Sequence, residues 1–131
     1  MSRGLTYQAI SYPDSGFRKY FRGAFLKSHI NRVLKQRRID CEDGWACYEK
    51  TVWSTLLEYF KVKYGYINSY FIPEDPLTLI LEVSETNDFS FEEFLMFVED
   101  KFELTVSIDA KIDKMTLGEL VIYLTEKQKT G

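Results

Sequence analysis

The sequence predicts a mainly α-helical domain, and two observations carry this prediction. Apolar residues recur every three or four positions over several long stretches, which is the spacing of one face of an α-helix. Two of these stretches open with a capping box, a Ser or Thr followed three positions later by Glu: Ser90 with Glu93, and Thr116 with Glu119. A chain of 131 residues is long enough for one domain with a sizeable core.

The first predicted helix, residues 17–38, places basic residues between its aromatic and apolar ones and contains no acid. Residues 1–39 carry nine Lys or Arg and one acid, a net charge of +8, whereas residues 40–131 carry eight basic and nineteen acidic residues, a net charge of −11. This asymmetry favours docking between the two parts, or a separate anionic partner for the basic one. We expect residues 1–43 to form a basic, aromatic-rich extension that packs on a helical domain of residues 44–131.

A second helix is predicted over residues 44–63, because apolar side chains share one helical face there. Its expected buried residues are Trp45, Tyr48, Val52, Leu56, Tyr59 and Phe60. Residues 64–85 lack a helical period and contain Gly65, Pro73 and Pro76, so they are interpreted as a long loop with one extended piece over residues 77–83. Loops of this length are uncommon inside a compact domain, so this one is expected to carry a function or a further element.

The third helix is predicted to begin at the Ser90 capping box, with Glu92, Glu99 and Asp100 facing solvent. Its expected buried residues are Phe91, Phe94, Leu95, Val98 and Phe102. A short connection with one possible turn around residues 109–113 leads to the last helix. That helix opens with the second capping box and is expected to bury Leu117, Leu120, Val121 and Leu124.

Residues 94–104 (Phe-Leu-Met-Phe-Val-Glu-Asp-Lys-Phe-Glu-Leu) and 115–124 (Met-Thr-Leu-Gly-Glu-Leu-Val-Ile-Tyr-Leu) resemble acyl carrier proteins. In that family an acidic second helix ends in a Glu-Glu-Phe-like segment, and a Thr-Val-Gly-Asp-Leu-Val-like segment opens the fourth helix. The resemblance covers residues 44–127 and implies an acyl-carrier-like four-helix bundle with an additional N-terminal basic helix. The chain is also similar to small carrier-like proteins of unknown function in enteric bacteria.

Carriers begin their second helix with Asp-Ser-Leu, and the serine takes the phosphopantetheine arm. The family's spacing puts Asp88 at the serine position of this chain, and a slip of one residue puts Phe89 there. Neither side chain has a hydroxyl to form the phosphodiester. The nearest hydroxyl is Ser90, which is either a displaced attachment site or the N-cap of the capping box, and the local sequence favours the cap. We therefore expect no cofactor, with phosphopantetheine only under the alternative reading.

The sequence shows no convincing catalytic or metal-binding constellation. His29 is the only histidine and lies in the basic predicted helix, so we expect it at or near the surface. Cys41 and Cys47 lack zinc-ligand spacing and are expected to be free thiols in a cytosolic protein. Glycine-rich phosphate loops are absent. We therefore expect no catalytic residue, no metal and no enzymatic activity.

The function predicted from these observations is that of a non-enzymatic, carrier-like, cytosolic module that binds a protein through an acidic helix face. The expected partner-binding residues are Asp88, Glu92, Glu93, Glu99 and Asp100, which suit a basic partner. The alternatives are a true acyl carrier protein modified at Ser90 and a small acidic immunity protein that neutralises a toxin. No apolar run is long enough to span a membrane, no apolar leader is expected, and the net acidity argues against strong nucleic-acid binding.

Overall fold

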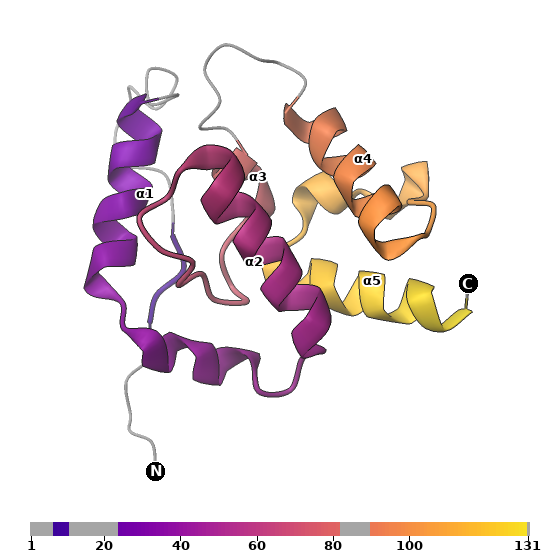
Figure 1. Ribbon diagram of the computed structural model, residues 1–131, viewed down its shortest axis with the longest axis horizontal. Coiled ribbons are helices and arrows are strands. Elements are labelled where there is room, and N and C mark those ends of the chain that lie inside the picture. The colour runs from indigo at the N-terminus through magenta and orange to yellow at the C-terminus, as the bar shows by residue number, and fades with distance from the viewer. Residues whose placement is uncertain (1–6, 11–23, 82–89, 131) are drawn as a thin grey trace.

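The computed structural model describes residues 7–10, 24–81 and 90–130, and these residues are mainly helical (Figure 1). The α-helices are α1 (Ala24–Gln36), α2 (Lys50–Tyr64), α3 (Leu77–Leu81), α4 (Ser90–Phe102) and α5 (Leu117–Thr130). Three 3-10 helices join them: η2 (Ile39–Trp45), η3 (Ile108–Ala110) and η4 (Ile112–Lys114). The described residues contain an isolated antiparallel bridge between Pro76 and Thr116 but no strand. The predicted mainly helical class is thereby confirmed.

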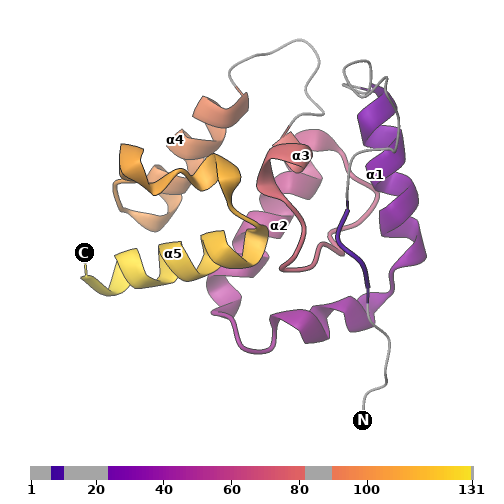
Figure 2. The same ribbon diagram turned by 180° about the vertical axis from the view of Figure 1, so that it is seen from behind.

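Helix α2 occupies the middle of the molecule, with α1 on one side and α4 and α5 on the other (Figures 1 and 2). Helix α2 packs on α5, and α3 packs on α4 and η4. The segment that follows α2 runs beside α1 in both views; Phe71, Ile72 and Asp75 of this segment are buried, whereas Ile67 is exposed. Residues predicted to form a loop thus lie among the helices.

Aromatic rings fill the centre of the core. Phe60 of α2 stacks on Phe94 of α4 with ring centroids 5.5 Å apart and meets Phe71 edge-on at 5.9 Å. All three side chains are fully buried. Rings that cross from one element to another in this way add about 0.5–1.5 kcal/mol per pair to the area they bury. The predicted buried residues of α5 are confirmed, as are Phe94, Val98 and Phe102 of α4.

The capping box at the start of α5 is confirmed atom by atom. The backbone N–H of Thr116 donates to Glu119 Oε1 at 2.9 Å, and the N–H of Glu119 donates to Thr116 Oγ1 at 3.2 Å. Both backbone donors would otherwise lack a partner within the helix. Helix α4 begins at Ser90 as predicted, but the side chain of Ser90 lies outside what the structure describes.

The predicted helix over residues 44–63 is wrong at its N-terminal end, because α2 begins only at Lys50. Trp45 stacks on Trp53 with ring centroids 5.4 Å apart, and its indole Nε1 donates to the carbonyl of Phe71 at 2.8 Å. In a continuous helix, residues eight positions apart are about 12 Å apart along the axis. The two rings can stack only if the helix is interrupted between them, which is what the turn after η2 does.

The extended piece predicted over residues 77–83 is also wrong where the structure describes it, because residues 77–81 form helix α3; residues 82–83 lie outside the described residues. Four of its five residues are buried, so the apolar residues follow no period that would distinguish a helix from a strand in the sequence. Pro76 immediately precedes α3, a position where its missing backbone N–H costs the helix no hydrogen bond. Tyr66 donates its hydroxyl to the carbonyl of Ile80 at 2.7 Å, which satisfies one carbonyl near the end of this short helix.

A buried salt bridge between Arg37 and Asp75 ties the N-terminal part of the chain to the segment after α2. The two side chains pair through Nη1 to Oδ2 at 2.8 Å and Nη2 to Oδ1 at 3.1 Å. The guanidinium also donates to the carbonyls of Gln8 and Tyr70 at 2.7 and 3.0 Å. The carboxylate also accepts from the backbone N–H groups of Ile10 and Ile72, both at 2.9 Å. One ion pair therefore joins three segments that are distant in sequence.

Of the first predicted helix, residues 17–38, the part from Ala24 to Gln36 is helical, and residues 17–23 lie outside the described residues. Leu26, Ile30 and Leu34 form its buried face. Arg37 follows the helix directly and is buried, where it pairs with Asp75 of the acidic part of the chain.

Candidate functional site

The outward face of α4 combines an exposed apolar side chain with acidic ones. Met96 lies in the middle of α4 and is 69% exposed. Glu92 and Asp100, four residues before and after it, are also exposed. Residues four apart lie above one another on a helix, so the three side chains form one stripe, acidic at both ends and apolar in the middle. We call these three residues the α4 stripe.

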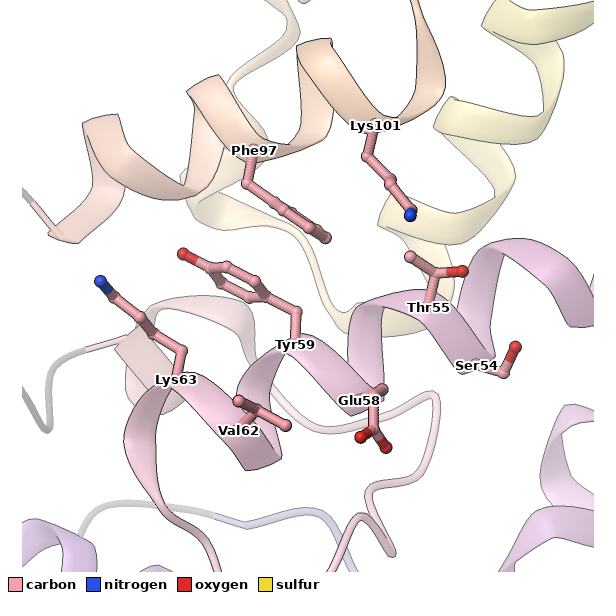
Figure 3. A pocket seen from close by; sticks show the side chains of 8 residues that line it. All are labelled: Ser54, Thr55, Glu58, Tyr59, Val62, Lys63, Phe97 and Lys101. Atoms are coloured by element: carbon pink, nitrogen blue, oxygen red, sulfur yellow. The ribbon is translucent and has the colours of Figure 1, made fainter.

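A groove of about 670 Å³ runs beside this stripe, between α2 and α4 (Figure 3). Tyr59 of α2 and Phe97 of α4 point toward one another and stack with ring centroids 4.0 Å apart and an angle of 21° between planes. Val62, on the α2 side, is 72% exposed. The complete lining is Ser54, Thr55, Glu58, Tyr59, Val62, Lys63, Phe97 and Lys101. The groove therefore has an aromatic wall and an exposed apolar edge.

Charged side chains stand at both ends of the groove. Lys63 of α2 pairs with Glu93 of α4 at 3.5 Å, and both side chains are somewhat under half exposed. At the other end, Lys101 extends from α4 toward Thr55 (Figure 3). Exposed pairs such as Lys63 with Glu93 contribute only about 0–1 kcal/mol to stability. Glu93 is therefore available to a partner at little cost, although Lys63 offsets part of its charge.

The predicted partner-binding residues divide into separate positions. Glu92 and Asp100 lie on the α4 stripe, and Glu93 lies at the end of the groove. Glu99 is half-buried, and its Oε2 accepts a hydrogen bond from the backbone N–H of Val106 at 2.8 Å. It thereby holds the connection that follows α4, rather than facing solvent as expected. Asp88 lies outside the described residues.

Sequence reasoning missed the apolar members of this surface. Met96 carries a readable signal, because it occurs at the spacing of the polar residues of α4, four positions from Glu92 and from Asp100. Tyr59 was expected to be buried in the core, but it is half-buried and forms the groove with Phe97. Only the packing of α2 beside α4 makes these two rings a surface feature.

Burial raises the pKa of two titratable side chains, Tyr59 and Cys41. Burial, together with the nearby Glu93 carboxylate, raises the pKa of Tyr59. Burial also raises the pKa of Cys41 to about 12, which disfavours the thiolate that nucleophilic chemistry needs. Cys41 and Cys47 are both free thiols, as predicted. The described part of the chain has no group of three or more His, Cys, Asp or Glu side chains placed to hold a metal ion.

Among the described helices, none is long and apolar enough to cross a membrane. Comparison of the chain with protein-family models, with curated proteins and with solved structures finds no match. The function therefore has to be inferred from the geometry of the surface.

Proposed function

We propose that this chain is a carrier-like, non-enzymatic module that binds a basic protein partner through the α4 stripe. The exposure of Met96 between two acidic residues carries the proposal. Fully burying a Met side chain is worth about 1.5–3 kcal/mol, and most of that gain is unrealised while 69% of the residue is exposed. Glu92 and Asp100 would speed association with a basic surface and fix its orientation. The expected binding surface of the partner is thus an apolar pocket bordered by Lys or Arg.

The carrier-like architecture is part of the same proposal. The order of a long helix α2, a long connection, an acidic helix α4, short 3-10 turns and a last helix α5 supports an acyl-carrier-like four-helix arrangement with α1 added. The capping box at Thr116 and Glu119 supports it as well, since it lies in the segment that resembles the opening of a carrier's fourth helix. Free thiols at Cys41 and Cys47 fit a reducing compartment, so we place the module in the cytosol.

A photoreactive residue in place of Met96 tests this proposal in cells of the source organism. We expect benzoylphenylalanine at position 96 to give a discrete protein adduct that disappears when Glu92→Lys and Asp100→Lys are introduced, because the reversed charges repel a basic partner. The yield of the adduct is also expected to fall when crosslinking is done in lysate at about 0.5 M salt, because charge interactions are strongly screened there.

The matched control carries the same photoreactive residue at position 122, because Ile122 on α5 is also exposed, at 50%. Adducts of equal yield from positions 96 and 122 would contradict a specific site on α4. If the adduct from position 96 survives both charge reversals, the partner binds at this site but does not recognise Glu92 and Asp100.

The absence of a serine at the carrier attachment position leads to a separate prediction. After co-expression with a broad-specificity phosphopantetheinyl transferase, the intact mass of the protein is expected to be unchanged, because Asp88 has no hydroxyl to accept the arm. A carrier protein with an intact Asp-Ser-Leu motif, expressed in the same cells, controls for transferase activity. A mass gain that is lost in Ser90→Ala would contradict the prediction and make the chain a carrier with a displaced site.

A further inference from the structure

A second groove, on the opposite side of the molecule from α4, is lined by basic residues. It lies between α1 and the segment that follows α2, two parts of the chain that run side by side in Figures 1 and 2. Its volume is about 470 Å³. Its described lining is Lys27, Ser28, Asn31, Arg32, Lys35 and Ile67. The groove thus presents three cations and two neutral polar side chains, with no acid among these lining residues.

The wall opposite α1 is fixed by hydrogen bonds rather than left as a loose loop. The backbone N–H of Ile67 donates to Asn31 Oδ1 at 2.9 Å, and Asn68 Nδ2 donates to the carbonyl of Leu34 at 3.2 Å. The N–H of Tyr70 donates in turn to Asn68 Oδ1 at 2.9 Å. The bond from Ile67 fixes the orientation of the Asn31 amide, whose Nδ2 is its hydrogen-bond donor. The groove is therefore organised before anything binds.

None of the three cations forms a salt bridge within the part of the chain that the structure describes. Lys27 and Lys35 are eight residues apart on α1, about 12 Å along the helix axis, with Arg32 between them. Arg32 and Lys35 are three residues apart, so these two like charges are neighbours on the helix surface and repel one another. A bound anion would remove this repulsion, and Arg and Lys are the usual donors to phosphate oxygens.

We propose that this groove binds a short polyphosphate anion of two or three phosphate groups. The spread of the cations over two helical turns suits several linked phosphates better than a single one. A long polyanion is disfavoured, because residues 40–131 carry a net charge of −11 and repel phosphates outside the groove. Ile67, 49% exposed at the edge of the groove, offers an apolar contact to a group attached to the phosphates.

Isothermal titration with inorganic tripolyphosphate at low ionic strength tests the proposal. We expect saturable binding that weakens as salt is added. The double substitution Arg32→Gln and Lys35→Gln is expected to weaken it about tenfold or more, because two charge-assisted contacts are lost. The matched control, Lys114→Gln with Lys129→Gln, changes the net charge equally at exposed positions outside the groove and is expected to leave the affinity within about twofold. Thermal melting of both variants establishes that they are folded.

Three results would overturn the proposal. One is the absence of tripolyphosphate binding by the unsubstituted protein, and another is an equal loss of affinity in the control variant. The third is tighter binding, at the same salt concentration, of a short single-stranded oligonucleotide or of vesicles rich in an anionic phospholipid. That result would assign the basic groove to a nucleic acid or a membrane surface instead.

Discussion

Replacing Asp75 with Ala is expected to lower the free energy of unfolding by about 3–5 kcal/mol, because it leaves the buried charge of Arg37 unpaired. The same change removes the acceptor for the backbone N–H groups of Ile10 and Ile72, each of which then lacks a partner in the interior. Urea denaturation followed by tryptophan fluorescence measures the loss, with the denaturant slope checking that unfolding remains cooperative.

The exposed ion pair between Lys63 and Glu93 supplies a matched control. Glu93→Ala is expected to change the unfolding free energy by less than about 1 kcal/mol, because that pair is solvated. The double change Arg37→Met with Asp75→Leu is expected to be less harmful than Asp75→Ala alone, since it removes both charges together. A loss in Asp75→Ala no larger than that in Glu93→Ala would show that Arg37 finds water or another partner when Asp75 is removed.

The Arg37–Asp75 pair also shows what the sequence did not reveal. The two residues are 38 positions apart, Arg37 within a run of basic residues and Asp75 between prolines. A charge run usually forms a solvated helix face, and nothing local marks one of its members as buried. Pairing at this distance depends on the way residues 65–76 pack beside α1, which is a tertiary event.

The local signals of the sequence were more reliable. The predicted start of α5 is confirmed, because its capping box specifies a helix start with two hydrogen bonds made over four residues. Helix α4 begins at Ser90 as predicted, and the side-chain bonds of its capping box lie outside the described residues. The predictions over residues 44–49 and 77–81 were wrong for a different reason. Apolar spacing predicted an α-helix from residue 44 and an extended piece from residue 77, whereas the structure has a 3-10 helix and a turn before α2 and a short α-helix at α3. Both observed elements make hydrogen bonds to distant parts of the chain, Trp45 to Phe71 and Tyr66 to Ile80.

The candidate site was predictable in part. The acidic residues of α4 were identified from its helical pattern, and Glu92 and Asp100 are exposed as expected. The hydrogen bond from Val106 to Glu99 was not foreseeable, because it depends on how the chain turns after α4. The stacking of Tyr59 on Phe97 likewise depends on two helices meeting, and periodicity describes each helix only by itself.

Gly118→Ala is expected to destabilise the protein by about 2 kcal/mol, although the same change in an exposed helix would stabilise it by about 1 kcal/mol. Gly118 is the second residue of α5, and its N–H donates to the carbonyl of Pro73 at 2.8 Å. A Cβ at this position would lie 2.9 Å from Pro73 Cβ and 2.8 Å from the hydroxyl of Tyr48. The expected sign is therefore set by the close approach of α5 to the segment before α3, and urea denaturation measures it.

The variant Tyr48→Phe separates the two contacts, because it removes the hydroxyl and leaves Pro73 in place. Gly118→Ala is expected to cost less in the Tyr48→Phe background than alone, and the difference is the coupling free energy of that contact. Stabilisation by Gly118→Ala would mean that helix propensity outweighs the clash and that the segment before α3 can move.

The Asp75 and Gly118 substitutions are expected to have non-additive effects on the free energy of unfolding. Asp75 lies in the segment that Gly118 contacts, and its carbonyl accepts from the N–H of Leu117 at 2.9 Å. Both act on the turn that connects α5, through Asp75 and Arg37, to the end of α1.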